Sequence, residues 1–365
     1  MVLNKNNIAI VLGTRPNFIK AASFLKEAQK YPEFNFTIIH TGQHFDYNMS
    51  EIFFEQMHIQ RPHINLNIKS EFHTEKIGKM LSSLDKVFKN NCFDVLVVFG
   101  DVNSTLAGAI IGLKNRCKII HVEAGLRSHD RRMPEEINRT VIDHISDLLF
   151  TTEPSANQNL IKEGIDESKI KYVGNLMIES MELFLNEINN SKIIDKLKIN
   201  KKEYVVATIH REENIDNKFL LNKILVILNE INTTIKVIFP IHPGTKNKIK
   251  SYGFDYLLDN LTVIEPLGYL DFMKLIINSK GVITDSGGIQ EETSHLGIPC
   301  CTLRDNTERL ITVELGSNKI FHLAEVQTNA ILNHLNNNFP SKIIPLWDKE
   351  VSSRIFNILK EKINL

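Results

Sequence analysis

IAIVLGTRPNFIK, residues 8 to 20, joins an apolar, β-branched run to a helical pattern through a glycine and a proline. The apolar run indicates a buried strand, and Pro16 suits the first position of a helix. Similar apolar runs recur at residues 36–42, 94–100, 118–125 and 147–153, and then at 204–211, 236–244, 261–268, 280–288 and 299–305. Longer helical patterns separate these runs. Such alternation is typical of βα units that feed a parallel sheet.

The length predicts two domains, because 365 residues exceed what one hydrophobic core usually serves. We expect an α/β fold of two Rossmann-like, doubly wound parallel-sheet domains, with residues 1–175 in the first and 176–345 in the second. The amphipathic segment 346–365 is predicted to pack back onto the first domain. Ligands of such sheets bind where strand carboxyl ends meet helix amino ends. The active site is therefore expected in the cleft between the domains.

Composition excludes several classes of function. Lys plus Arg and Asp plus Glu both number 43, so no overall basic field exists to hold nucleic acid or an anionic membrane. The N-terminal stretch lacks the pattern of a signal peptide, and no apolar run is long enough to cross a membrane. These features predict a cytoplasmic protein. The four cysteines form no CxxC pair, which favours reduced thiols in the core over a metal site.

TDSGGIQEE, residues 284–292, has the composition of an anion cradle. Ser286 is a potential capping residue, and Gly287 and Gly288 leave backbone N–H groups accessible at the start of a helix. An ordinary strand–turn–helix junction is the alternative. Glu292, or its neighbour Glu291, could hold the vicinal hydroxyls of a ribose, which favours a nucleoside diphosphate. The stretch lacks the G-x-G-x-x-G spacing and the P-loop lysine, so no NAD, ATP or other cofactor is predicted.

GTRPNFIK, residues 13–20, repeats this arrangement in the first domain. Arg15 and Lys20 are predicted to face the same cleft, where two cations would compensate the charge of a pyrophosphate without a metal. Solvated cations near a helix start are the alternative, and it applies to Lys20 more than to Arg15.

Carboxylates end two neighbouring apolar strands. Asp101 follows VLVVFG and Glu123 ends IIHVE, where desolvation favours a role in proton transfer. Glu135, at the next helix start, is predicted to add a third acid. The loop 126–134 is predicted to carry its arginines over Glu123, although Arg131 and Arg132 are given no role. A helix-capping or structural carboxylate is the alternative for any one of these acids.

Two histidines follow strands of the second domain. His210 in ATIHREEN and His242 in IFPIHPG stand at strand ends, where a phosphate or a proton-transfer partner would be met. A structural role is the alternative for each. No HxxxH, DxD or His/Cys cluster is present, so no metal is predicted. No G-x-S-x-G pattern indicates a nucleophile.

Nine motifs, taken in their order along the chain, resemble those of the UDP-N-acetylglucosamine 2-epimerases. They are GTRPxxIK, TGQH, GDxxST, HVEAGLR, MPEEINR, IHREEN, PxHP, DSGGIQEE and RDNTER. They occur in this order between residues 13 and 309. The resemblance implies two Rossmann-like domains in a GT-B arrangement. It also implies inversion at C2 of UDP-GlcNAc to give UDP-ManNAc, by anti elimination of UDP to 2-acetamidoglucal and re-addition.

The resemblance also assigns roles to individual residues. It implies acid/base or intermediate-stabilising roles for Asp101, Glu123, Glu135 and His210, without identifying the base. The UDP-sugar contacts that it implies are Arg15, Lys20, His242, Ser286, Gly287, Gly288, Glu292 and Arg309. It further implies a homodimer, with the nucleotide sugars as the small-molecule partners.

The sequence departs from the family pattern at a few positions. Asn17 replaces the common glutamate after GTRP, and Leu310 and Ile311 replace a proline and a glutamate. Some bacterial relatives bind a second, activating UDP-GlcNAc at positions that match Gln43, Arg211 and His242 here. Three alternatives remain for the reaction: an epimerase of UDP-2,3-diacetamido-glucuronate, a hydrolysing UDP-GlcNAc 2-epimerase, and a GT-B glycosyltransferase.

Overall fold

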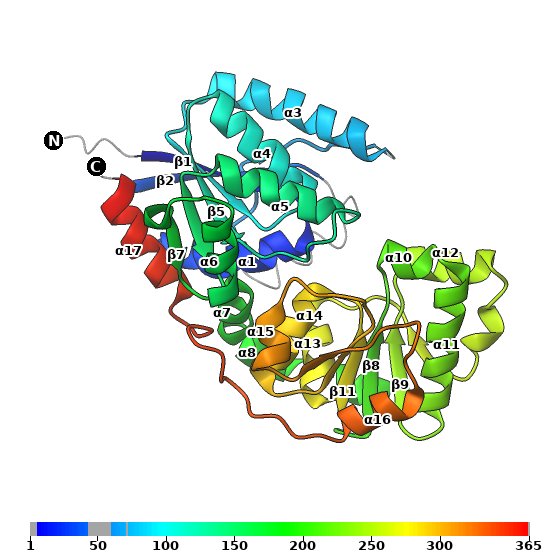
Figure 1. Ribbon diagram of the computed structural model, residues 1–365. Coiled ribbons are helices and arrows are strands. Elements are labelled where there is room, and N and C mark those ends of the chain that lie inside the picture. Colours follow the sequence, from blue (N-terminus) through cyan, green and yellow to red (C-terminus); the bar gives the residue numbers. More distant parts are fainter. Residues whose placement is uncertain (1–5, 43–59, 71, 364–365) are drawn as a thin grey trace. The chain divides into compact units, whose positions relative to one another are not determined.

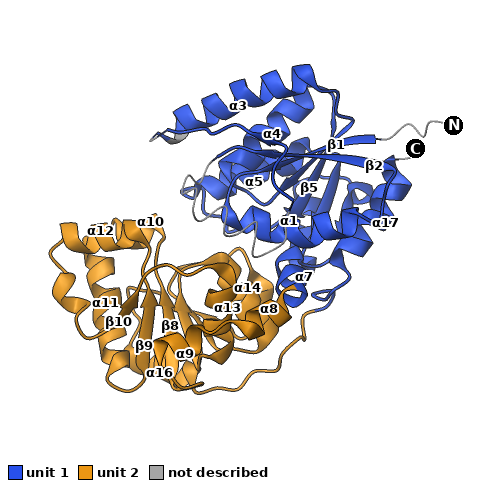
Figure 2. Cartoon of the chain, turned by 180° about the vertical axis from the view of Figure 1, so that it is seen from behind, with its two compact units in different colours: residues 1–183, 345–365 blue, residues 184–344 orange. Residues whose placement is uncertain are grey.

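The computed structural model describes residues 6–42, 60–70 and 72–363, and the chain divides into two compact units. Unit 1 comprises Met1–Leu183 with Pro345–Leu365, and unit 2 comprises Phe184–Ile344 (Figure 2). Each unit holds one parallel sheet with helices on its faces (Figure 1). The prediction of two parallel-sheet α/β domains is therefore confirmed.

Unit 1 contains a seven-stranded sheet in the order β3-β2-β1-β4-β5-β6-β7. Its strands are β1 (Asn6–Leu12), β2 (Phe34–His40), β3 (Ile64–Asn65), β4 (Val95–Phe99), β5 (Lys118–Ala124), β6 (Leu148–Thr151) and β7 (Ile170–Tyr172). Its helices are α1 (Arg15–Ala28), α3 (His73–Asn90), α4 (Asn103–Lys114), α5 (Pro134–Ile145), α6 (Pro154–Lys162), α7 (Leu176–Leu183) and α17 (Val351–Ile363). The short helix η1 (Glu167–Lys169) precedes β7.

The two faces of this sheet carry different helices. Figure 1 shows α3, α4 and α5 on one face and α1 with α17 on the other. Leu96, Val98 and Ile119 pack against α3, α4 and α5 in one core cluster. On the opposite face, Phe24 of α1 lies 5.6 Å from Phe99 and 4.7 Å from Phe356 of α17, measured between ring centroids. The C-terminal helix thus packs on the first sheet unit.

Unit 2 contains a six-stranded sheet in the order β10-β9-β8-β11-β12-β13. Its strands are β8 (Tyr204–Thr208), β9 (Lys236–Pro240), β10 (Thr262–Ile264), β11 (Gly281–Thr284), β12 (Cys300–Thr302) and β13 (Asn318–Ile320). Its helices are α8 (Leu185–Asn190), α9 (Ile193–Leu197), α10 (Glu212–Ile215), α11 (Lys218–Asn232), α12 (Pro243–Ser251), η2 (Asp255–Leu257), α13 (Tyr269–Asn278), α14 (Gly287–Leu296), α15 (Leu310–Glu314) and α16 (Thr328–Leu335).

Both strand orders place the site-bearing segments at a topological switch. In unit 1 the chain leaves β1 for β2 on one side and later enters β4 on the other side. In unit 2 the same reversal occurs around β8 and β11. Loops at such a point diverge, and the carboxyl ends of the central strands become accessible to a ligand. The predicted site residues lie at the carboxyl ends of β1, β4, β5, β8, β9 and β11 or in the segments that follow them, except Arg309, which follows β12.

The prediction of thiols buried in the core holds for three of the four cysteines. Cys117, Cys300 and Cys301 are buried, as expected of core thiols, but Cys92 is exposed. All four cysteines are free, and burial raises the pKa of both Cys117 and Cys300 to about 11. In the described part of the chain, no helix combines the length and the apolar character that a membrane span requires.

Candidate functional site

Glu123 ends β5 in an unusual backbone conformation. Its φ is +72°, and the pairing of β5 with β6 shifts register between Val122 and Ala124. A left-handed conformation costs a residue other than glycine about 1 to 3 kcal/mol and is often found at functional sites. The Glu123 carboxylate pairs with the ammonium group of Lys20, and their side chains are only 5% and 7% exposed.

This pair corrects one expectation for Lys20. The lysine is not a solvated cation at a helix start, because it is buried in α1 and its ammonium group contacts Glu123. Gly100, with φ of +63°, leaves room for it, since a Cβ at Gly100 would lie 3.4 Å from Lys20 Nζ. Arg15, at the first position of α1, is half-buried.

Asp101 is joined to a second buried cation. Its carboxylate pairs with Arg139 of α5, whose side chain is 2% exposed. Arg139 Nη1 also donates to Glu136 Oε2 at 2.8 Å. Asn138 Nδ2 donates to the backbone carbonyl of Asp101 at 2.8 Å. These contacts tie the turn after β4 to α5, next to the strand that ends in Glu123.

The two glutamates at the start of α5 differ in burial, which the sequence did not predict. Glu135 is half-buried in the first turn, whereas Glu136 is buried and pairs with Arg139. Glu136 also accepts hydrogen bonds from the backbone N–H groups of Ser128 and His129, both at 2.9 Å. It therefore fixes the loop before α5, a role that the sequence did not distinguish from that of Glu135.

Arg127 of the loop 126–134 has other partners than the predicted Glu123. It is buried and pairs with Asp143 at 2.7 Å and with Glu163 at 2.6 Å. Arg132 is 85% exposed and pairs with Asp130. A cation that contacts Glu123 comes from α1, through Lys20, which the loop prediction did not include.

Asn17 has a structural explanation. Its Oδ1 accepts from Thr14 N at 3.2 Å and from Thr14 Oγ1 at 3.1 Å, while its Nδ2 donates to Phe99 O at 2.9 Å. A glutamate could not make this last hydrogen bond as a donor in its ionised form. The amide thus links the turn after β1 to the end of β4. Gln43 lies outside the described residues.

In unit 2, Asp285 organises the end of β8. This buried carboxylate accepts from the backbone N–H of His210 at 3.1 Å, from that of Arg211 at 3.0 Å and from Asn214 Nδ2 at 3.0 Å. His210 Nδ1 lies 3.2 Å from Asp285 Oδ1, and the imidazole is 46% exposed. Asp285 therefore holds His210 by both backbone and ring, and the rest of the ring faces solvent.

The first turn of α14 has open backbone donors flanked by arginines. Ser286 is the N-cap residue, but its side chain makes no capping hydrogen bond, which corrects the expected hydroxyl cap. Gly287 and Gly288 follow and are half-buried. A Cβ on Gly287 would lie 2.6 Å from Arg309 Nη1. The arginine that the RDNTER motif supplies therefore packs directly against the glycine turn.

Glu308 and Arg309 belong to a buried cluster of charges. Arg309 pairs with Glu308, and its Nε lies 2.9 Å from Glu291 Oε1. Arg304 Nη2 pairs with Glu308 Oε2 at 2.9 Å. The cluster places two arginines beside the amino end of α14, where backbone N–H groups and the helix dipole also favour an anion.

Glu292 has a partner that the sequence reasoning missed. Tyr269 Oη donates to Glu292 Oε1 at 2.9 Å, and both side chains are buried. Tyr269 begins α13 directly after Gly268, in a segment without a recognisable site motif. Arg139 and Arg304 were also missed, although their motifs MPEEINR and RDNTER were recognised. Their partners lie on other elements, so only the fold reveals them.

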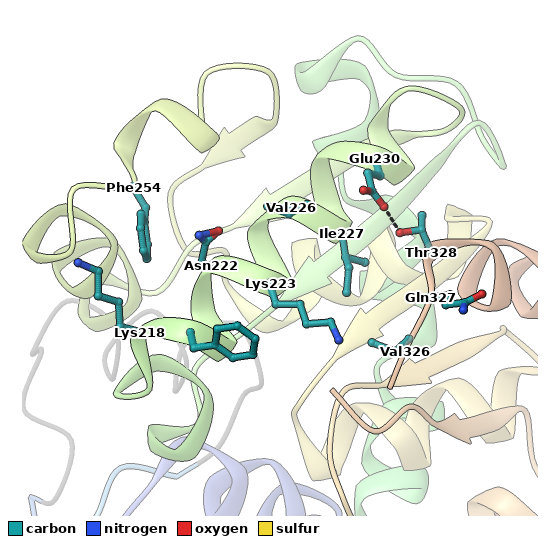
Figure 3. A pocket seen from close by; sticks show the side chains of 11 residues that line it. Lys218, Asn222, Lys223, Val226, Ile227, Glu230, Phe254, Val326, Gln327 and Thr328 are labelled. Carbon is teal, nitrogen blue, oxygen red and sulfur yellow. Dashed lines mark hydrogen bonds between the residues drawn. The ribbon is translucent and has the colours of Figure 1, made fainter. Parts of the chain in front are cut away.

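His242 is exposed at the start of α12, and a hollow lies elsewhere in unit 2, along α11. His242 caps α12, with its Nδ1 accepting from Gly244 N at 3.1 Å. Figure 3 shows a hollow of about 860 Å³ along α11, lined by side chains such as Val226 and Phe254. None of the predicted site residues lines this hollow. Among the described residues, no cluster of three or more His, Cys, Asp or Glu could hold a metal ion.

Comparison with known proteins agrees with the motif pattern. The family model for UDP-N-acetylglucosamine 2-epimerase matches residues 26–360. The UDP-N-acetylglucosamine 2-epimerase of Methanocaldococcus jannaschii is 43% identical over 96% of this chain and 98% of its own. A UDP-2,3-diacetamido-2,3-dideoxy-D-glucuronate 2-epimerase of Pseudomonas aeruginosa is 40% identical over 85% of this chain and 87% of its own.

A solved structure extends the likeness to the fold. The crystal structure of the M. jannaschii UDP-GlcNAc 2-epimerase in complex with UDP-GlcNAc and UDP superposes with a TM-score of 0.89 at 40% identity. The match covers 97% of this chain and 99% of that one. Family model, sequence relatives and fold agree over nearly the whole length, and the chain belongs to the UDP-N-acetylglucosamine 2-epimerase family.

Proposed function

We propose that the protein interconverts UDP-GlcNAc and UDP-ManNAc by anti elimination of UDP to 2-acetamidoglucal, followed by re-addition of UDP. The observation that carries this proposal is Glu123, a strained and buried carboxylate paired with Lys20 at the end of β5. Asp101 follows the adjacent strand. Two carboxylates at neighbouring strand ends suit a reaction in which a proton is removed and later returned.

The C2 proton of the sugar is not acidic, so its removal must accompany departure of UDP from C1. Asp101, Glu123, Glu135 and His210 are our candidates for acid/base or intermediate-stabilising roles. Asp285 would orient His210 through the ring contact of 3.2 Å.

The UDP leaving group would be held chiefly by unit 2. Gly287 and Gly288 would present backbone N–H groups to the diphosphate and Ser286 its hydroxyl, with Arg309 beside them. Glu292 would accept from the ribose hydroxyls. Stabilising the departing diphosphate lowers the barrier to elimination, because charge develops there in the transition state.

Cations of unit 1 and His242 would add further contacts. We propose Arg15 and Lys20 as cations for the diphosphate, and His242 as another contact of the UDP-sugar. Lys20 pairs with Glu123, so a bound diphosphate would share this ammonium group with the carboxylate. A homodimer, which the family resemblance implies, and the cytoplasmic location predicted from the sequence are part of the proposal.

A second candidate substrate is UDP-2,3-diacetamido-glucuronate. The observation in its favour is the P. aeruginosa relative, whose identity of 40% is close to that of the M. jannaschii enzyme at 43%. The two reactions share inversion at C2, so the same carboxylates would serve both. They differ in the groups at C3 and C6 of the sugar.

A proton NMR time course in D₂O, without added metal or NAD, tests the reaction. Purified protein with UDP-GlcNAc should give a mixture with UDP-ManNAc, and both sugars should gain deuterium at C2. Free ManNAc and UDP would instead identify a hydrolysing enzyme. An unchanged spectrum would contradict the GlcNAc assignment, and the diacetamido-uronate would be tested next.

The Tyr269→Phe variant should raise the Kd for UDP about tenfold while leaving kcat nearly unchanged. The variant removes the hydroxyl that donates to Glu292 Oε1, and a hydrogen bond to a charged group contributes about 1.5 kcal/mol. Isothermal titration with UDP measures the effect. Titration with uridine, which retains the ribose, should show the same loss. Unchanged affinity for both ligands would mean that Glu292 does not hold the ribose.

A further inference from the structure

A buried chain of charged side chains lies behind Glu123. His121 Nδ1 is 2.7 Å from Asp143 Oδ1, and Asp143 Oδ2 is 2.7 Å from Arg127 Nη1. Arg127 continues the chain to Glu163 at 2.6 Å. His121, Asp143 and Arg127 are at most 3% exposed. The proposed chemistry uses none of these residues, yet His121 stands only two positions before Glu123.

One hydrogen bond defines the protonation of His121 at Nε2. Its Nε2 lies 2.8 Å from the carbonyl oxygen of Gly100, which can only accept, so Nε2 carries a proton. Burial acts to raise the pKa of Asp143, but His121 and Arg127 outweigh it, and the pKa lies below its ordinary value. Nδ1 of the same ring lies 2.7 Å from Asp143 Oδ1, so the imidazole bridges the turn after β4 and the carboxylate of α5.

Asp143 spans the irregular end of β5. Its Oδ1 meets His121, which precedes Glu123, and its Oδ2 accepts from the backbone N–H of Gly125, which follows it, at 3.1 Å. One carboxylate from α5 thus fixes the strand on both sides of the left-handed residue. Through Gly100, His121 also fixes the turn that leads into Asp101.

The arrangement explains why Glu123 faces α1. Alternate residues of a regular strand share a face, so Glu123 would follow His121 toward α5. The register shift and the φ of +72° instead turn Glu123 to Lys20 of α1, on the opposite face of the sheet (Figure 1). A conformation of this kind persists only where surrounding contacts determine it.

We infer that Asp143 and His121 are positioning residues that hold Glu123 in its reversed orientation and fix the turn before Asp101. The catalytic part of this inference rests on the proposed function, because Glu123 and Asp101 are its proposed acid/base groups. The groups around His121 are Asp143 of α5, the Gly100 carbonyl after β4 and, beyond Asp143, Arg127 with Glu163. None of them is a proposed substrate contact.

The first experiment uses the unaltered protein. Nitrogen-15 NMR of the histidine side chains should show that Nε2 of His121 carries a proton, as its contact with the Gly100 carbonyl requires. A lone pair on Nε2 would overturn the proposed link between His121 and the turn before Asp101. This measurement does not depend on turnover or on a substrate.

The second experiment compares Asp143→Asn and His121→Gln with Glu179→Gln. Glu179 is a matched control, because it is a buried carboxylate of the same unit that accepts from Ser352 N at 3.0 Å and touches no proposed site residue. Both test variants should lower kcat by roughly tenfold to a hundredfold, as expected for a misplaced catalytic group, and should leave UDP affinity unchanged. The control should keep the kcat of the wild type.

Carbon-13 backbone shifts of Glu123 supply a readout that is independent of activity. They should report the left-handed conformation in the wild type and in Glu179→Gln, and should lose it in Asp143→Asn. A retained conformation together with an unchanged kcat would overturn the positioning role. If the wild-type protein fails to epimerise UDP-GlcNAc, the proposed function falls, whereas the two NMR readouts still decide the structural inference.

Discussion

The Glu123→Gln variant should lose turnover by about three to four orders of magnitude while it still binds UDP. The amide keeps the shape of the side chain but cannot accept a proton, and general acid/base catalysis typically contributes 10² to 10⁴ in rate. The proposed UDP contacts lie mainly in unit 2, on α14 and Arg309. Measurements of kcat by NMR and of Kd by titration with UDP separate the two effects.

The same substitution leaves Lys20 buried without its carboxylate. Removal of one partner of a buried ion pair destabilises a protein by about 3 to 5 kcal/mol, so thermal unfolding of Glu123→Gln should shift to lower temperature. The double variant Lys20→Met with Glu123→Gln should recover most of this stability and remain inactive. Recovered stability without activity would show that unfolding does not cause the loss of turnover.

Two outcomes would contradict a catalytic role for Glu123. Turnover of the single variant within about tenfold of the wild type, far from the expected loss of about three to four orders of magnitude, would remove it from the chemistry. Equal loss of turnover and UDP binding, with stability restored in the double variant, would indicate that the carboxylate shapes the site instead. Asp101 would then become the leading candidate for the base.

The fold could be predicted because its central strands are buried on both faces. Such strands read as continuous apolar runs, as VLVVF does in β4, and all the predicted runs correspond to strands. The strands that were missed, β3, β7 and β13, have two or three residues each and lie at sheet edges. An edge strand this short has neither an apolar run nor a full alternation to identify it.

The candidate site was predictable only as positions along the chain. Strand ends in a parallel sheet share one edge, which is why Asp101 and Glu123 could be selected without a structure. The direction of a side chain after a strand end depends on local backbone angles, and nothing in HVEAG indicates that Glu123 turns toward α1. The choice between Glu135 and Glu136 likewise depends on which face of α5 is buried.

Contacts between side chains that are far apart in the sequence could not be predicted for a related reason. Arg139 meets Asp101, and Tyr269 meets Glu292, through packing of different elements. Each of these residues has an ordinary alternative, as a surface charge or a core aromatic, that composition and spacing cannot exclude. Only the relative placement of helix and strand within a unit decides between the alternatives.

Gly287→Ala should abolish most UDP binding without unfolding the protein. A Cβ at this position would lie 2.6 Å from Arg309 Nη1 and 2.8 Å from Glu308 Oε1. Both atoms are ends of side chains, so they can move, and overpacking of this kind costs about 1 to 3 kcal/mol of stability. Arg309 would leave the start of α14, where we propose that the diphosphate binds.

The expected loss of UDP affinity is about a hundredfold or more, because truncating or displacing one member of a buried charge pair costs 2 to 5 kcal/mol of binding. Gly78→Ala in α3 is the control, since a Cβ there would have no neighbour within 4 Å. That control should keep its UDP affinity and gain about 0.5 to 1 kcal/mol of stability from reduced backbone freedom. Unchanged affinity in Gly287→Ala would contradict the diphosphate cradle, because a methyl group cannot occupy the turn and leave both the backbone donors and Arg309 in place.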